Sequence, residues 1–81
     1  MSQDNQDFVI VKNRKLFCET DKAILIGPPT MPLHSRNSKG KTWIPKVFVS
    51  LPFPFEEKGD IADVEIVRWV AEQNDLEYEE V

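Results

Sequence analysis

The sequence predicts a small α+β domain: a curled, barrel-like antiparallel sheet of four or five strands with one short C-terminal helix. Three observations support this class. Short runs of β-branched and aromatic residues recur between turn residues in the first half of the chain, residues 41–51 alternate between two faces, and one helix-spaced apolar stripe follows residue 66. Eighty-one residues allow one core, so we expect a single domain over residues 1–81.

The first half of the chain carries three candidate strands. Residues 8–11 and 16–18 flank the turn-like Asn13-Arg14-Lys15, which predicts a hairpin. Residues 22–26 are apolar on both faces, which is typical of a central strand, and Gly27-Pro28-Pro29 ends it. A long loop over residues 27–40 follows, and loops of this length in compact domains are usually functional or flexible.

The alternating segment 41–51 predicts a strand with one apolar face. That face should line the core, and its members are Trp43, Pro45, Val47, Val49 and Leu51. Pro45 cannot donate a hydrogen bond to a sheet, so it indicates an edge strand or a bulge. The Pro52-Phe53-Pro54-Phe55 run should end the strand and expose two aromatic rings.

The C-terminal third admits two interpretations. Asp60 could cap a helix that begins at Ile61, or residues 63–66 could form a last strand before a short helix from Val67. In both cases a buried helical stripe is predicted, with Trp69 beside it; the stripe contains Val67, Val70 and Ala71.

The ends of the chain are predicted from local signals. Asn74 or Asp75 suits a left-handed helix stop, with Leu76 folded back over it. We expect polar residues 1–6 to be disordered and residues 77–81 to be an acidic tail.

Composition limits the classes of function. Hydrophobic residues make up 41% of the chain and charged residues 30%, which is typical of a globular protein. Strictly apolar runs such as Ala23–Ile26 are far shorter than the roughly 20 residues of a membrane span, so we expect no membrane contact. A single cysteine, Cys18, and an N-terminus without a secretory pattern favour a cytoplasmic location.

Candidate catalytic and metal-binding groups are few. A nucleophilic Cys18–His34 pair would need direct contact and an orienting third group, and a zinc site would need several Cys or His residues. Gly40-Lys41-Thr42 matches the end of a phosphate-binding P-loop, but Ser35 stands where the first glycine belongs, and a strand follows instead of a helix. We expect a protein that is not an enzyme and needs no cofactor or metal.

Charge is divided along the chain. Residues 1–46 contain eight Lys or Arg and four Asp or Glu, whereas residues 47–81 contain two and ten, giving local charges of +4 and −8. Two solvated faces of an ordinary domain would explain this division. Aromatic anchors with a charged rim are also common at protein interfaces. The predicted protein-binding residues are Phe53, Phe55, Glu56, Glu57 and Asp60.

The basic sector suggests an alternative function, which is direct binding of single-stranded nucleic acid by a small β-barrel through the 34–46 loop. A cationic groove with stacking aromatics holds single strands. The candidate contacts are Arg36, Lys39, Lys41 and Lys46. A sequence pI near 4.9 argues against a general nucleic-acid binder.

Three blocks of the chain resemble a group of small, mostly uncharacterised phage and mobile-element proteins with a KAILV…WIPKS…WLAEKKGL pattern. The blocks are Lys22-Ala23-Ile24-Leu25, Trp43-Ile44-Pro45-Lys46, and Trp69-Val70-Ala71 with Leu76. The chain departs from the pattern in its long 27–40 loop and at three further positions, which are Val47, Arg68 and Asp75.

The resemblance implies a strand at 63–66, a short helix from Val67, and a phage or plasmid origin. Small acidic proteins of such elements often modulate host nucleic-acid machinery, and anti-CRISPR inhibitors are among them. The resemblance therefore implies an accessory protein that binds, and modulates or inhibits, a protein of a host nucleic-acid-processing complex.

Overall fold

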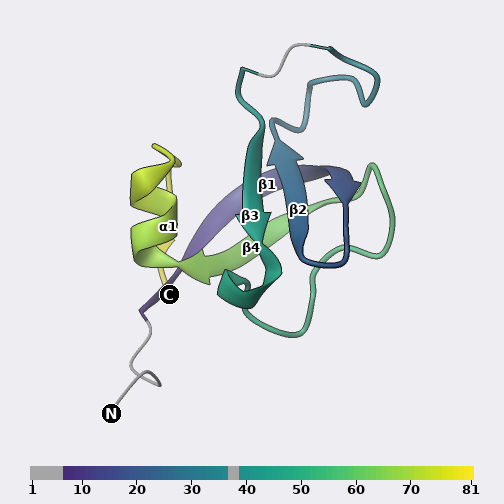
Figure 1. Cartoon of the computed structure of the whole chain (residues 1–81). Helices are drawn as coiled ribbons and strands as arrows, with labels where there is room; N and C mark the ends of the chain where they lie inside the picture. The colour runs from purple at the N-terminus through teal and green to yellow at the C-terminus, as the bar shows by residue number, and fades with distance from the viewer. Residues whose placement is uncertain (1–6, 37–38) are drawn as a thin grey trace.

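The computed structural model describes residues 7–36 and 39–81, which form a five-stranded antiparallel sheet and one short α-helix (Figure 1). The predicted α+β class is confirmed, although the sheet is not closed into a barrel. The predicted disordered segment 1–6 lies outside the described residues. The elements in chain order are β1 (Phe8–Glu19), β2 (Ala23–Gly27), β3 (Thr42–Pro45), the 3₁₀-helix η2 (Lys46–Phe48), β4 (Ile61–Val67), α1 (Arg68–Gln73) and β5 (Glu79–Glu80).

β1 is one twelve-residue strand, so the predicted hairpin over residues 8–18 is wrong. The residues expected to turn instead form an irregularity, at which the register with β4 shifts between Val11 and Arg14. Asn13 has a φ of 55° there, a left-handed conformation that asparagine tolerates better than most residues. Because an extra residue bends and twists a strand, the turn signal produces a bend inside β1.

Four strands follow the order β3-β2-β1-β4, and β5 pairs with β1 off this path. β2 therefore lies between two strands, as predicted for a central strand. Its side chains divide between two faces: Ile24 and Ile26 are buried, whereas Leu25 lies between Cys18 of β1 and Trp43 of β3 in the pairing register.

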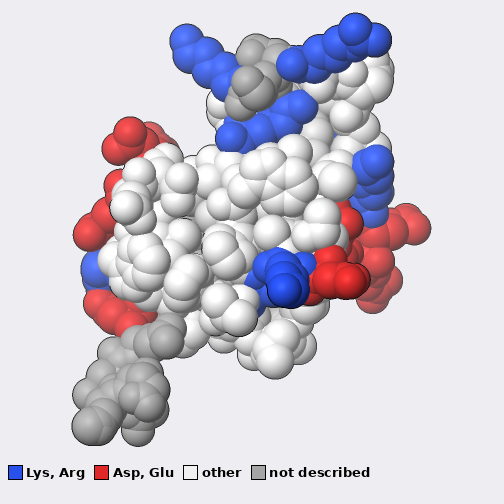
Figure 2. Space-filling model, viewed as in Figure 1, with Lys and Arg blue, Asp and Glu red and all other residues white. Residues whose placement is uncertain are grey.

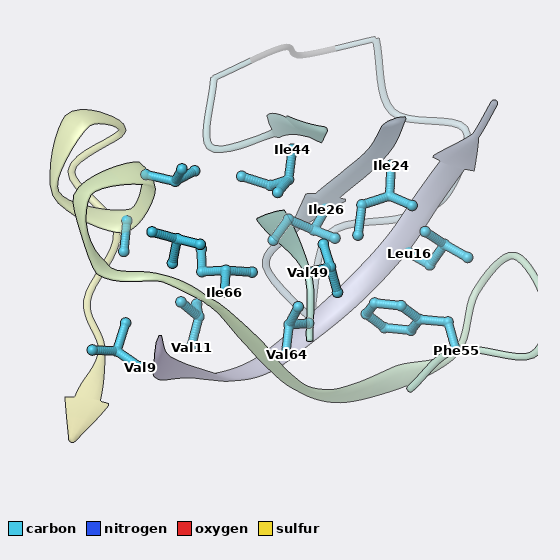
Figure 3. Close-up of a cluster of buried hydrophobic side chains, with 13 residues drawn as sticks. Val9, Val11, Leu16, Ile24, Ile26, Ile44, Val49, Phe55, Val64 and Ile66 are labelled. Atoms are coloured by element: carbon cyan, nitrogen blue, oxygen red, sulfur yellow. The ribbon is translucent and has the colours of Figure 1, made fainter. Parts of the chain in front are cut away.

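The core lies between the β2–β3 part of the sheet and the β1–β4 part, as Figure 3 shows. Side chains from these four strands meet there, and α1 adds Val70 and Ala71. The largest fully buried side chains are Leu16, Ile24, Ile26, Ile44, Ile66, Val9, Val11 and Val64.

The predicted core face of segment 41–51 is wrong at four of its five positions. β3 ends at Pro45, and in it Ile44 is fully buried opposite Ile24 while Trp43 is 49% exposed. Alternation defines two faces but does not say which one is inside, and here the pairing of Ile44 with Ile24 decides. The exposed members of the predicted face are Trp43, Pro45, Val47 and Leu51. Val49 is buried because the 3₁₀ turn changes the direction of the chain before it.

After η2 the chain crosses to β4. Val49 forms an isolated bridge with Ile66, and the Ser50 N–H donates to the Glu65 carbonyl at 2.8 Å. This contact brings the segment after β3 to β4, the strand at the other end of the sheet order, without a continuous ladder between them. The bridge therefore covers one side of the core while the sheet stays open.

The strand-then-helix interpretation of the C-terminal third is confirmed, because α1 follows β4 directly. Asp75 adopts the predicted left-handed conformation, with φ 56°. The Leu76 N–H donates to the Ala71 carbonyl and the Asp75 N–H to the Glu72 carbonyl, which is the hydrogen-bond pattern of a Schellman helix end. Leu76 then packs against the core, and the expected acidic tail contributes β5, paired with β1.

The reversed face of β3 predicts opposite effects for two adjacent residues. Ile44→Ala should lower the free energy of unfolding by about 2–5 kcal/mol, because it leaves a cavity in the core. Trp43→Ala should cost about 1 kcal/mol, because half of its side chain is already exposed. Urea denaturation of both variants measures the difference, and equal losses would contradict the assigned orientation.

Candidate functional site

The aromatic residues predicted to bind a protein are not exposed. Phe55 is 4% exposed and belongs to the core, where Figure 3 shows its ring pointing into the buried cluster. Phe53 is partly buried and meets Phe55 edge to face, with ring centroids 5.8 Å apart. The expectation of two exposed rings is wrong, because this connection closes the core and does not project from it.

The carboxylate of Asp60 has a structural role. Its Oδ2 atom accepts hydrogen bonds from the backbone N–H groups of Glu56 and Glu57, at 2.8 and 3.0 Å. An aspartate that binds nearby backbone groups stabilises a turn, and this one holds the turn before β4. Among the five predicted protein-binding residues, Glu56 and Glu57 are the ones with exposed side chains.

Two lysines hold the long loop against β1. Lys41 Nζ donates to the Ser35 carbonyl at 2.7 Å, and Lys15 Nζ donates to the Met31 carbonyl at 2.9 Å. Both ammonium groups lie near the Phe17 ring, at 5.1 and 5.9 Å from its centroid, within the range of a cation–π contact. Lys41, a predicted nucleic-acid contact, is therefore engaged in fixing the base of the loop.

Among the other predicted nucleic-acid contacts, Lys46 lies apart from the loop that carries Arg36 and Lys39. Lys46 follows β3 and pairs with Glu19 at 2.6 Å, with the Phe53 ring centroid 5.6 Å away. Arg36 and Lys39 are exposed in the long loop. Figure 2 shows Lys and Arg side chains gathered over this loop, so part of the basic sector predicted over residues 1–46 is a surface feature of the loop.

Exposed apolar side chains lie on β3, η2 and α1 beside the half-buried Phe48, and we call this set the aromatic face; its residues are Trp43, Val47, Phe48 and Trp69. Trp43 is 49% exposed, Trp69 53% and Val47 79%. The Phe48 and Trp69 rings join η2 to α1, with centroids 5.0 Å apart in an edge-to-face arrangement. Figure 2 shows a largely uncharged surface in this region, with Lys, Arg, Asp and Glu side chains at its edges.

Large aromatic side chains supply much of the binding energy at protein interfaces, which makes this face the strongest candidate site. Sequence reasoning missed it because it placed Trp43 in the core. Trp69 carried a usable signal, because the helical spacing put it beside the buried Val70 and Ala71 stripe.

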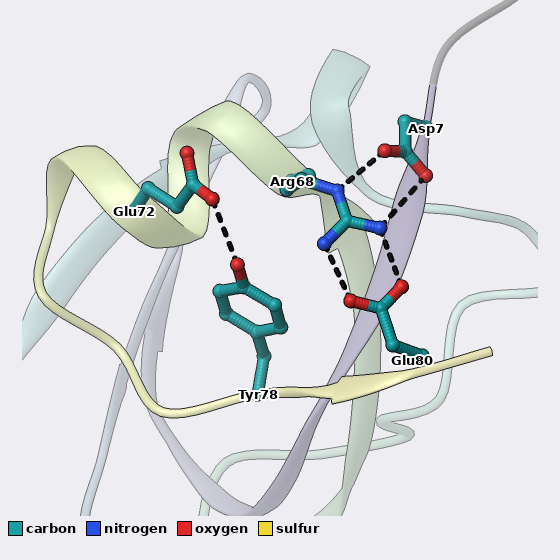
Figure 4. Close-up of polar contacts among 5 residues, drawn as sticks. All are labelled: Asp7, Arg68, Glu72, Tyr78 and Glu80. Carbon is teal, nitrogen blue, oxygen red and sulfur yellow. Dashed lines mark hydrogen bonds and ion pairs between the residues drawn. The ribbon is translucent and has the colours of Figure 1, made fainter.

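A cluster of polar side chains joins the two ends of the described chain (Figure 4). The Arg68 guanidinium donates to both carboxylate oxygens of Glu80 and to the carboxylate of Asp7, and the Arg68 N–H donates to the Asp7 carbonyl at 2.7 Å. The Tyr78 hydroxyl donates to Glu72 Oε2 at 2.7 Å. Arg68 thus connects the start of β1, the start of α1 and β5.

These contacts shift the acid–base equilibria of the cluster. Hydrogen bonds from Arg68 hold the pKa values of Asp7 and Glu80 below their ordinary ranges, and the same bonds raise the pKa of Arg68. The hydrogen bond to Glu72 raises the pKa of the Tyr78 hydroxyl, although Arg68 opposes this shift.

Groups with catalytic or metal-binding chemistry do not gather in the described residues. Cys18 lies half-buried in β1, and His34 is exposed in the long loop. Within residues 7–36 and 39–81, no three His, Cys, Asp or Glu side chains are grouped as metal ligands would be. Gly40-Lys41-Thr42 leads into β3, not into the helix that a P-loop requires.

Searches against protein-family models, curated proteins and solved structures found no match for this chain. In the described residues, no helix has the length and apolarity needed to span a membrane.

The Arg68 cluster predicts acid-sensitive attachment of β5. Because the folded-state pKa values of Asp7 and Glu80 are lowered, their stabilising contribution is present above their unfolded pKa values of about 4 and is lost as the pH falls through the folded values. We expect the protection of amides in the β1–β5 pairing, measured as hydrogen exchange relative to the intrinsic rate at each pH, to fall below about pH 4. An Arg68→Gln variant should show low protection at every pH, and unchanged protection in it would contradict the assignment.

Proposed function

We propose that this protein is a non-enzymatic binding protein whose main contact surface is the aromatic face. The observation that carries the proposal is the half-exposure of two tryptophans, Trp43 on β3 and Trp69 on α1. Tryptophan side chains are costly to leave in water, and they are enriched among the residues that dominate binding energy at protein interfaces.

The surroundings of the aromatic face suggest the chemistry of its partner. The long loop that precedes β3 is cationic, and Arg36 and Lys39 are exposed on it. A protein surface with an apolar centre and carboxylates on the side of this loop would complement both features. The acidic side chains of the 53–60 segment would instead favour a basic partner surface, but Phe55 and Asp60 of that segment serve the fold.

The resemblance to phage and mobile-element proteins suggests where to look for the partner. We propose a protein of a host nucleic-acid-processing complex, which this chain would modulate or inhibit. The partner should carry an acidic patch, which would contact the cationic loop, next to an apolar surface, which would contact the aromatic face.

Replacing both exposed tryptophans should reduce partner binding. We expect Trp43→Ala with Trp69→Ala to lower affinity at least tenfold, because large anchors at the centre of an interface often contribute about 2 kcal/mol or more each. Affinity capture from host lysates with wild-type protein would identify the partner, and titration calorimetry would then compare the variants.

The matched control for this experiment is Ile61→Ala. Ile61 is 51% exposed, like the tryptophans, but lies at the end of β4 opposite to α1. Its replacement should leave the affinity unchanged. If the tryptophan variant binds as well as the Ile61 variant, the aromatic face is not the contact surface.

Direct binding of single-stranded nucleic acid is the second candidate. The observation that favours it is the exposed ring of Trp43, two residues after Lys41 and beside the cationic loop. An exposed aromatic ring near lysines can stack on a base while the cations contact phosphates.

Salt dependence tests this second candidate. Fluorescence anisotropy with a labelled oligothymidylate should show binding that weakens steeply as salt rises, and Arg36→Ala with Lys39→Ala should reduce both the affinity and the slope by roughly two phosphate contacts. Absence of binding at low salt would exclude this function and leave protein binding.

A further inference from the structure

One edge of β1 is only partly paired. β4 runs along the opposite edge, while β2 and β5 share this one, with β2 pairing from Lys15 onward and β5 pairing at Val9 and Ile10. Between these two stretches lies an open groove of about 1020 Å³, lined by Lys12 and Arg14 of β1 and by the base of the long loop. The groove therefore continues the line of β5 along β1.

Cations follow this edge. Arg68 binds Glu80, and Lys12 lies 3.7 Å from Glu79, so each residue of β5 has its own positive partner. Arg14 and Lys41 line the groove beyond them. An extended chain on this edge would meet Arg68, Lys12, Arg14 and Lys41 in turn.

The carboxylates that also line the groove belong mostly to the segment that carries β5. Glu77 and Glu79 lie in the short stretch between the helix stop and the end of β5, and would move away with it, whereas Asp75 stays at the end of α1. With β5 displaced, the lining is predominantly cationic.

We infer that the edge of β1 from Phe8 to Lys12, together with the groove beside it, binds an extended acidic segment of another protein, and that β5 occupies part of this site in cis. The incoming segment would add a strand to β1 as far as Lys12, since the left-handed conformation of Asn13 ends the regular ladder there. Beyond that point, carboxylates of the segment would contact Arg14 and Lys41. This site is separate from the aromatic face.

Several features make β5 replaceable. It is two residues long, and the side chains of Glu79 and Glu80 are 65% and 67% exposed. Ion pairs between exposed side chains are screened by solvent and each is modest, so a longer acidic strand with more pairings can compete with it. Leu76, which is packed on the core, would keep the helix end in place while the residues after it move.

The experiment uses the full chain and a fluorescein-labelled peptide that copies residues 75–81, Asp-Leu-Glu-Tyr-Glu-Glu-Val. Glu79→Gln with Glu80→Gln weakens the internal strand without removing core residues. We expect the peptide to bind this variant at least tenfold more tightly than the wild-type protein. Adding Arg68→Gln should remove the gain, whereas adding Lys58→Gln, which removes a cation from the turn before β4, should not.

Two further measurements test the acidic specificity of the site and the exchange of β5 between copies. A peptide with glutamine in place of each glutamate should bind at least tenfold more weakly, and equal binding would overturn the acidic specificity. Equal affinity of the wild-type and double-glutamine proteins would overturn the competition with β5. Light scattering that shows dimers unable to bind peptide would also overturn the proposal, in favour of exchange of β5 between copies. If the double variant unfolds by circular dichroism, Glu80→Gln alone takes its place.

Discussion

A long strand in a small protein must satisfy backbone hydrogen-bonding groups along both of its edges, and the twelve-residue β1 does so over most of its length. It pairs with β4 on one edge, and with β5 and β2 in succession on the other. Register shifts near Asn13 and after Leu16 bend the strand, so that β2 and β3 come to face β4 across the core. A straight β1 would leave one apolar face uncovered, and α1 and the Val49 bridge would have no core to close.

The same bend separates the surfaces of the molecule by chemistry. Because Ile44 pairs with Ile24 on the inner face of the bent sheet, Trp43 must lie outside, and it joins Trp69 on the aromatic face. Lys15 and Lys41 draw the cationic loop down onto Phe17 beside that face. The acidic C-terminal segment instead pairs with the N-terminal part of β1, at Val9 and Ile10. Two proposed binding surfaces therefore coexist on a chain of 81 residues without sharing a side chain.

Local signals in the sequence predicted the elements that depend on local chemistry. The apolar run of β2 and the left-handed stop at Asp75 followed from residue type and spacing alone, whereas the strand before α1 was chosen over a helix on the resemblance. The features that depend on pairing between segments far apart in the sequence could not be predicted. The residues around Asn13 suit a hairpin turn and a bulge equally, and only the pairing of β1 with β4 selects the bulge. In the same way, alternation showed that Trp43 and Ile44 lie on opposite faces, but the partner strand decided which face is inside. The burial of Phe55 likewise depends on a core built from elements far from it in the sequence.

Arg68 also has a topological consequence. It binds Asp7 at the start of the described chain and Glu80 near its end, so the two ends lie beside one another, as Figures 1 and 4 show. A short linker could join them, and new ends could be opened in the exposed turn at residues 56–58, because permuted chains are tolerated where termini are close and the cut falls in a surface loop. Such a circular permutant would keep every strand pairing described above. The contacts of this fold depend on which strands pair with one another and not on the order of the strands in the sequence.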